Sequence, residues 1–325
     1  MEQLIISVLM TTYNPNFDYL KESLDSIYSQ TYNNFEVILV DDGSEINVKQ
    51  FLNENQYKNL HYIRLAKNQG ITRALNIGLS YCRGKYIARM DDDDISLPNR
   101  FELQVKYFEN NPKTNILGCN KINFGENNNQ SEIMINNLSR ERQQVELFFS
   151  NIGVPHPSVM VRKSFLDEFN ICYNEDYKKS QDYGLWVSCS KYSKIECLPE
   201  TLLKYRCHKK QISSNSKEEQ MFFKDKVRLD QLERLGIYAS EDEKRLHLDF
   251  CADNVKKEQQ NKMLKWIRKL YKYNEKTLYF DSKIFKYRLF VKGYTNLSDC
   301  NKFSRFIKII YIFKFEFILY YLKRK

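Results

Sequence analysis

Apolar strand-like runs alternate with amphipathic helical runs over the first 120 residues, and this alternation constrains the fold more than any other feature of the chain. The strand-like runs are Leu4–Tyr13, Phe35–Val40, His61–Leu65 and Lys85–Met90. Between them, Phe17–Gln30 and Thr72–Cys82 space their apolar residues three and four apart, as helices do. The pattern predicts an α/β protein with a Rossmann-like, mostly parallel sheet that is flanked by helices.

The rest of the chain departs from this alternation. Ser96 before Leu97-Pro98 predicts a helix N-cap with proline in the first turn, and we expect that helix to end near Asn110. Residues 125–140 are rich in asparagine and are predicted to form a loop, and a strand is expected at 158–161. From residue 216 to the end the pattern is helical and basic.

The net charge of +10 is unevenly distributed. Residues 1–216 contain 25 Lys and Arg against 26 Asp and Glu, whereas residues 217–325 contain 26 against 15. The last third is therefore predicted to carry a surface that meets phosphates, of lipid headgroups or of nucleic acid. The eight cysteines contain no CxxC pair and the N-terminus has no signal-peptide pattern, so we expect a cytoplasmic protein with reduced thiols.

Two acidic clusters follow predicted strands directly. In Asp91 to Asp94, four consecutive carboxylates repel one another unless a cation lies among them. Alternate residues of an extended segment point the same way, so Asp91 and Asp93 are suited to share one Mg²⁺ or Mn²⁺ ion. Asp41-Asp42 precede a glycine turn, where a carboxylate can accept hydrogen bonds from a base or a ribose. Each cluster taken alone is equally compatible with an ordinary acidic turn.

Three further residues carry chemistry. Asp182 begins a predicted helix, as a simple cap or as a general base that deprotonates an acceptor hydroxyl. Arg206 and His208 lie two residues apart near the end of the ordered pattern. Arginine can meet a phosphate through two hydrogen bonds, and histidine can bind a metal or a leaving phosphate.

The order and spacing of these motifs resemble the family 2 glycosyltransferases, which have the GT-A fold and invert the anomeric centre. The matching segments are Ser7–Asn14, Val40–Ser44, Asn68–Gly78, Gly84–Asp94, His156-Pro157-Ser158, Gln181–Trp186 and Tyr205–His208. Each segment alone is common, but their ordered succession over residues 4–214 is a specific signal.

The resemblance implies a role for each matching residue. The nucleotide-sugar would be bound by Thr11, Tyr13, Asn14, Asp41, Asp42, Arg73, Asp91, Asp92 and Arg206. The outer positions of the D-x-D motif, Asp91 and Asp93, would hold the metal together with His208, and Asp182 would be the catalytic base. The family's usual Glu-Asp pair is Gln181-Asp182 here, which keeps the base and leaves the first carboxylate without a counterpart.

The resemblance also implies a domain plan and a reaction. A GT-A catalytic domain is expected over residues 1–215, with a nucleotide-sugar half to about 120 and an acceptor half over 121–215. Residues 216–325 would form the helical basic region. The expected enzyme is an inverting, Mn²⁺- or Mg²⁺-dependent hexosyl- or N-acetylhexosaminyltransferase. Its donor would be a UDP-sugar, and its acceptor a glycan or lipid-linked hydroxyl in capsule or lipopolysaccharide O-antigen synthesis.

Residues 303–322 are rich in aromatic and apolar side chains that alternate with lysines, and Lys323-Arg324-Lys325 follow. The run is too short and too interrupted for a transmembrane helix. It predicts a segment (303–325) that lies in the membrane interface, with a helix docked on the catalytic domain as the alternative. The interface reading predicts a peripheral protein on the cytoplasmic face of the inner membrane.

Other functions fit the sequence less well. A sugar nucleotidyltransferase would need a glycine-rich basic phosphate loop near the N-terminus, and residues 11–16 offer none. A nucleic-acid-binding protein would leave the acidic clusters unexplained, because carboxylates repel phosphates. No nucleic-acid partner is therefore expected. A non-catalytic protein that binds a nucleotide-sugar remains an alternative.

Overall fold

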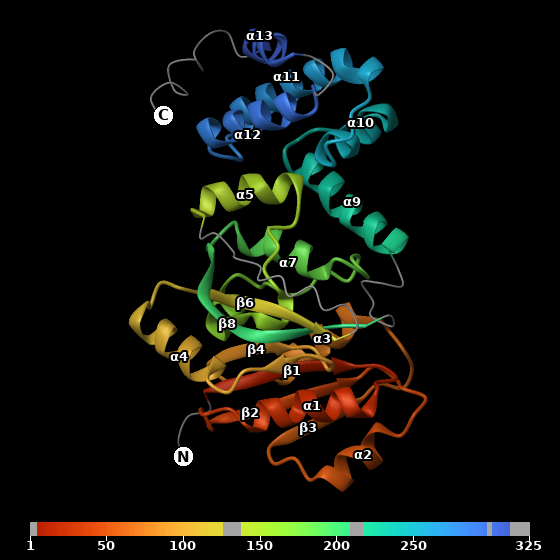
Figure 1. The fold of residues 1–325 in the computed structure, drawn as a ribbon, viewed down its shortest axis with the longest axis vertical. Coiled ribbons are helices and arrows are strands. Elements are labelled where there is room, and N and C mark those ends of the chain that lie inside the picture. Colours follow the sequence, from red (N-terminus) through yellow and green to blue (C-terminus); the bar gives the residue numbers. More distant parts are fainter. Residues whose placement is uncertain (1–4, 126–137, 209–216, 298–300, 313–325) are drawn as a thin grey trace. The chain divides into compact units, whose positions relative to one another are not determined.

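The computed structural model describes residues 5–125, 138–208, 217–297 and 301–312 of the chain (Figure 1). The chain forms two compact units. Unit 1 consists of residues 1–140 and 153–223, and unit 2 of residues 141–152 and 224–325. Within the described ranges, no helix is both long enough and apolar enough to cross a membrane.

Unit 1 is built on one eight-stranded mixed sheet with the order β3-β2-β1-β4-β7-β6-β8-β5. Only β7 and β5 run antiparallel to the strands that they pair with. The remaining strands are mutually parallel, as the alternation predicts. The strands are β1 (Ile6–Thr12), β2 (Phe35–Asp41), β3 (Leu60–Arg64), β4 (Tyr86–Met90), β5 (Ile95–Ser96), β6 (Ile116–Gly125), β7 (Met160–Arg162) and β8 (Ile195–Cys207).

Helices cover both faces of this sheet, because the central strands are buried on both sides. One face packs against α1 (Phe17–Tyr28), α2 (Val48–Asn55) and α4 (Arg100–Asn110), through side chains such as Leu24, Leu52 and Phe101. The other face packs against α3 (Ile71–Tyr81), α6 (Lys163–Glu168) and α7 (Gln181–Cys189). The result is the three-layer arrangement typical of α/β folds.

The sequence predicts most elements of the first half, and misses others for identifiable reasons. The structure confirms the four strands and the two helices of the alternating region. Helix α2 is short and polar, and β6 and β8 carry no strict alternation of apolar and polar residues. The sequence pattern therefore does not predict these three elements. The predicted N-cap at Ser96 is wrong. Ser96 pairs in β5 with Leu203, and α4 begins after Asn99.

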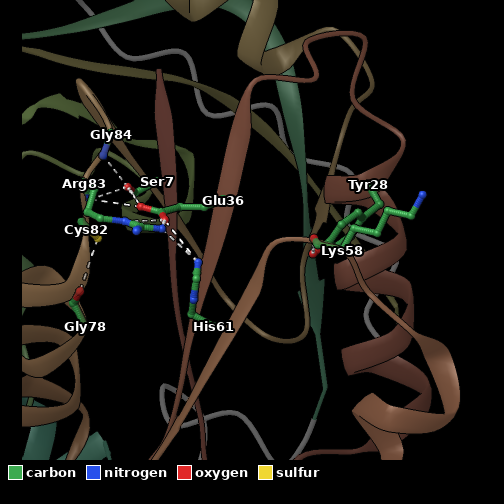
Figure 2. A network of polar contacts seen from close by, with 9 residues as sticks. All are labelled: Ser7, Tyr28, Glu36, Lys58, His61, Gly78, Cys82, Arg83 and Gly84. Carbon is green, nitrogen blue, oxygen red and sulfur yellow. Dashed lines mark hydrogen bonds and ion pairs between the residues drawn. The ribbon is translucent and has the colours of Figure 1, made fainter. Parts of the chain in front are cut away.

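A polar network joins the amino-terminal ends of β1, β2 and the segment before β4, as Figure 2 shows. Its centre is the buried carboxylate of Glu36, which accepts hydrogen bonds from Ser7 Oγ (2.7 Å), from Arg83 N (3.0 Å) and from the Arg83 guanidinium (2.6 Å). His61 Nε2 lies 3.4 Å from the same carboxylate. We call this group the amino-edge network; its contacts join β1, β2 and β3 to the segment before β4.

Unit 2 is helical. It contains α5 (Arg140–Phe149), α10 (Glu241–Cys251), α11 (Gln260–Thr277), α12 (Ser282–Thr295), α13 (Lys302–Ile312) and most of α9 (Lys217–Arg234). Its core includes Phe148 and Phe149 of α5, which pack with Phe250, Phe280 and Phe285. A helix from the middle of the sequence therefore completes the core of the C-terminal unit. The predicted interface segment 303–325 falls partly on α13, and residues 313–325 lie outside the described residues.

Candidate active site

The carboxyl-terminal ends of β1, β2, β4 and β8 meet at one edge of the sheet of unit 1. The chain passes from β1 to β2 on one side, and β4 later pairs with β1 on the other, so the order of strands reverses at β1. Ligands of open α/β sheets bind outside such a reversal. The structure brings the predicted motifs at 11–14, 41–44, 91–94 and 206–208 to this edge.

The acidic run after β4 is the centre of the edge. One carboxylate oxygen from each of Asp91, Asp93 and Asp94 lies within 4.8 Å of the others. Asp92 faces elsewhere and accepts a hydrogen bond from Thr12 Oγ1 (2.6 Å). Asp91 forms an ion pair with the buried Arg89. Three carboxylates therefore converge, while the fourth is tied to the end of β1.

Burial and mutual repulsion raise the pKa of three of these carboxyl groups. Burial is the largest cause for Asp92, and with the charge of Asp93 it raises the pKa to about 7. Burial and the charge of Asp91 also raise the pKa of Asp93, although His208 opposes the shift. The pKa of Asp94 lies well above its usual range for the same reasons. A cluster that disfavours its own charge stabilises any cation placed in it.

The donor set fits a divalent cation. Carboxylate oxygens are the ligands that Mg²⁺ prefers and that Mn²⁺ accepts. One oxygen of Asp94 is buried and accepts no hydrogen bond from the described residues. His208 Nε2 lies 2.9 Å from Asp93 Oδ2, so the two predicted ligands are adjacent. Asp91, Asp93 and Asp94, with His208 beside them, are the residues that would hold the metal.

Arg206, at the end of β8, braces the acidic run. Its backbone N–H donates to Asp94 Oδ1 (2.8 Å) and its Nε donates to the carbonyl oxygen of Asp93 (2.7 Å). Its terminal nitrogen is paired with Glu22 of α1. The guanidinium also lies over the rings of Tyr19 (4.2 Å) and Phe124 (4.5 Å). Arg206 is 7% exposed, and its geometry holds the acidic run in place.

Both aspartates of the turn after β2 accept hydrogen bonds from other residues of the protein. Asp41 accepts hydrogen bonds from Tyr62 Oη (2.5 Å) and from the backbone N–H of Ser44 (2.8 Å). Asp42 accepts from the backbone N–H groups of Gln69 (2.7 Å) and Gly70 (2.8 Å). Burial, the largest cause, raises the pKa of Asp42 in spite of these bonds. The two carboxylates shape the loops of the edge, and their predicted contact with a nucleoside stays a prediction.

The glycine between Asp42 and Ser44 is required by the geometry of this turn. Gly43 has φ +75°, and a Cβ there would lie 2.5 Å from the backbone of Lys67. A side chain would therefore push the loop 67–70 away from Asp42.

The end of β1 supplies an open surface. Thr11 is buried, whereas Tyr13 is 46% exposed. Asn14 has φ 47° and connects two loops, because its N–H donates to Ser44 Oγ (2.9 Å) and its Oδ1 accepts from the N–H of Glu45 (2.7 Å). Arg73 on α3 is exposed and pairs with Glu175 (2.9 Å).

Asp182 lies in the first turn of α7. The helix begins directly after Ser180, which has the unusual backbone angle φ 55°. Tyr173 is buried, and this burial raises the pKa of its phenol; Arg89 opposes the shift, and the charges of Asp182 and Asp91 add to it. Tyr173 Oη in turn lies 2.7 Å from Nε2 of His156, the histidine of the matching segment 156–158.

Four residues of the site are not predicted individually from the sequence: Glu22, Arg89, Asp94 and Tyr173. Asp94 had a signal, because it belongs to the same acidic run. Arg89 precedes that run and lies within a matching segment. Glu22 and Tyr173 belong to no motif in the sequence, and only the tertiary structure brings them close to the other residues of the site.

Known proteins resemble this chain in both sequence and fold. Residues 7–169 match the family described as glycosyl transferase family 2. An uncharacterized glycosyltransferase of Methanocaldococcus jannaschii is 35% identical over 210 residues, which cover 63% of this chain and 72% of that protein. The amylovoran biosynthesis glycosyltransferase AmsE of Erwinia amylovora is 32% identical over 211 residues, which cover 62% of this chain and 76% of AmsE.

Two solved structures share the fold. TarS 1-349 of S. aureus, crystallised in complex with UDP-GlcNAc, aligns with a TM-score of 0.61 at 16% identity, over 94% of this chain and 91% of that one. The mannosyltransferase PcManGT of Pyrobaculum calidifontis, in complex with GDP-Man and Mn²⁺, aligns with a TM-score of 0.51 at 13% identity, over 94% and 73% of the two chains. The fold is the GT-A fold that the motifs imply.

Proposed function

Since the chain belongs to glycosyl transferase family 2 and is a glycosyltransferase, we propose that it moves a sugar from a UDP-sugar to a hydroxyl of a glycan or lipid-linked acceptor. We assign it to the assembly of a surface polysaccharide such as a capsule or an O-antigen. AmsE, named for amylovoran biosynthesis, supports this assignment. The complex of TarS with UDP-GlcNAc supports a uridine donor and a hexosyl or N-acetylhexosaminyl group.

The observation that carries the proposal is the acidic cluster at the carboxyl edge of the sheet, next to the point where the strand order reverses. Asp91, Asp93 and Asp94 form a cluster that attracts a cation. Asp182 belongs to a separate element and lies in the first turn of α7. A glycosyl transfer needs both: positive charge near the departing diphosphate, and a base near the acceptor hydroxyl.

In the proposed reaction Asp182 takes the proton of the acceptor hydroxyl while that oxygen attacks C1 of the donor sugar. The bond between C1 and the diphosphate oxygen breaks in the same displacement. The configuration at C1 is therefore inverted, and no covalent sugar–enzyme intermediate forms. Tyr13, Asn14 and Arg73 would line the nucleotide side, and Arg206 would keep Asp93 and Asp94 in position.

The proposed cofactor is Mn²⁺ or Mg²⁺, held by Asp91, Asp93 and Asp94 with His208 beside them. When bound, such an ion would neutralise the negative charge that develops on the nucleoside diphosphate. The complex of PcManGT with GDP-Man and Mn²⁺ supports a metal-dependent reaction on this fold. We also propose that the enzyme works at the cytoplasmic face of the membrane, where lipid-linked acceptors are exposed, and that segment 303–325 contributes to this contact.

A donor-hydrolysis screen tests the proposal. Purified protein is incubated with UDP-, GDP- and dTDP-sugars in Mn²⁺, Mg²⁺ or EDTA, and the nucleoside diphosphate released is measured. We expect release of UDP that needs the metal and disappears in Asp93→Ala. Asp167→Ala is the matched control, because it removes an exposed carboxylate that pairs with Lys163 on its own helix.

Two results would contradict the proposal. If Asp93→Ala hydrolyses the donor as fast as the wild type, the acidic cluster has no part in the reaction. If no donor is hydrolysed and calorimetry shows that UDP does not bind with Mn²⁺, the proposed UDP-sugar donor is wrong. Release of a different nucleoside diphosphate would keep the reaction and change the donor.

A further inference from the structure

Helix α11 of unit 2 carries a row of cations on one face. Lys262, Lys265, Arg268, Lys272 and Lys276 are all exposed, and they recur at intervals of three and four residues. At about 100° per residue these positions span an arc of about 120°, and at 1.5 Å per residue the row is about 21 Å long. We call these five residues the α11 basic row.

The opposite face of α11 is the one that packs. Met263, Trp266, Ile267 and Leu270 are buried in the core of unit 2. Helices α10, α12 and α13 contact α11, and Ile309 of α13 lies beside Ile267 on this buried side (Figure 1). The α11 basic row therefore points away from the helices of its own unit.

The cations of the row have no acidic partners among the described residues. Lys269, one position off the row, is the lysine of α11 that forms an ion pair, with Glu243 at 2.6 Å. Lys276 lies 5.9 Å from the ring of Tyr273, and Glu275 flanks the row at its end. Closely spaced, unneutralised cations repel one another, so the row is stabilised by any surface that supplies negative charge along its length.

We propose that the α11 basic row is a docking surface for an anionic membrane. Its row of exposed cations, four of them lysines on flexible stems, suits a plane of phosphate headgroups. Leu278, 73% exposed, lies two residues after Lys276, and an apolar side chain near cations favours a lipid interface over a nucleic acid. This surface differs from segment 303–325, and its binding does not depend on the transfer reaction.

Sedimentation with lipid vesicles tests this surface on the full chain. The wild type is mixed with phosphatidylcholine vesicles, with or without about one third phosphatidylglycerol, at about 0.1 M salt. We expect binding only to the anionic vesicles, and release at high salt. Because each cation at an anionic surface contributes about fivefold to binding, Lys262→Glu/Lys265→Glu/Lys272→Glu should weaken binding by about a hundredfold or more.

The matched control is Lys49→Glu/Lys58→Glu/Lys106→Glu. It changes the net charge equally at exposed lysines of unit 1, and we expect its binding to change far less. A second variant ends at residue 312 and should keep most of the binding. Circular dichroism checks that each variant is folded, and donor hydrolysis without vesicles checks the catalytic unit separately.

Several results would overturn the proposal. These are absence of binding to anionic vesicles, equal losses in the two lysine triples, or binding that vanishes in the variant ending at 312 while the α11 triple retains it. A short DNA duplex that displaces the vesicles at the same salt would make the partner a nucleic acid instead. Loss of vesicle binding with normal donor hydrolysis separates this inference from the proposed function.

Discussion

The sheet of unit 1 carries acidic groups at both of its ends, and their surroundings are opposite at the two ends. At the amino edge a single carboxylate, Glu36, is surrounded by donors: Ser7, Arg83 and His61 (Figure 2). At the carboxyl edge three carboxylates, those of Asp91, Asp93 and Asp94, converge within 4.8 Å. The two ends therefore differ in the ratio of hydrogen-bond donors to carboxylates.

The pKa values follow this ratio. Burial would raise the pKa of Glu36, but hydrogen bonds from Arg83 and Ser7 outweigh it and hold the pKa below its usual range. Burial also raises the pKa of Asp93 and Asp94, and there the neighbouring carboxylates add to the shift. A buried carboxylate with its own donors stabilises a fold, whereas a crowded one stores repulsion that a cation can relieve. The following predictions test this division, from the largest expected effect to the smallest.

Replacing Asp182 by Asn should have the largest effect on turnover. Removal of a general base costs about 10²–10⁴-fold in rate. Donor binding should stay near normal, because Asp182 belongs to the acceptor side of the proposed reaction. Single-turnover transfer and calorimetric titration of UDP with Mn²⁺ measure the two quantities. Full activity in Asp182→Asn would remove this residue from the mechanism.

Asp93→Asn should lower turnover by about 10²–10³-fold, because it removes a carboxylate that would hold the cation beside the departing diphosphate. It should also abolish the rise in unfolding temperature that Mn²⁺ produces in the wild type, since a ligand that binds the folded state stabilises it. Without metal the variant should be at least as stable as the wild type, because one repulsive charge is gone. Thermal unfolding with and without Mn²⁺ measures this. A large loss of stability in the metal-free variant would show that Asp93 is structural, like Glu36.

Glu22→Gln should weaken the ion pair that positions Arg206, while it leaves Asp91 to Asp94 unchanged. Glu22 pairs with Arg206, and Arg206 holds the Asp93 carbonyl and the Asp94 carboxylate. Loss of a partner behind metal ligands costs about 10–100-fold in metal affinity. Titration of Mn²⁺ should show this loss, while the affinity for UDP in EDTA stays the same. Glu102→Gln, on α4 and bonded to Thr31, is the matched control.

Glu36→Gln should cost stability and leave activity unchanged. Replacing a charged acceptor by a neutral one leaves the donors of Arg83 less well satisfied, at about 1–3 kcal/mol. The contribution of Glu36 is present above the pKa of the unfolded glutamate, about 4.3, and is lost as the pH falls through the lower folded pKa. The stability difference between wild type and Glu36→Gln should therefore shrink in acid. Denaturant unfolding from neutral to acidic pH measures it, and a difference that does not change with pH would contradict the assignment.

The sequence by itself predicted the features that depend on residues close together in the chain. The four strands of the alternating region show as apolar runs, and the acidic groups show as residues that follow those runs. The order of the motifs also identified the family and the GT-A fold. These features can be recognised in the sequence, because hydrophobic periodicity and strand ends are properties of neighbouring residues.

The tertiary structure alone decided which groups face one another. Glu22 and Arg206 are 184 residues apart in the chain, and no pattern joins them. Asp41 and Asp42 look like free ligands in the sequence, yet the fold gives both of them protein donors. Helix α5, from the middle of the chain, packs into the core of the C-terminal unit. Such pairings depend on how distant elements pack, since a side chain's role as brace or ligand is set by its neighbours in space.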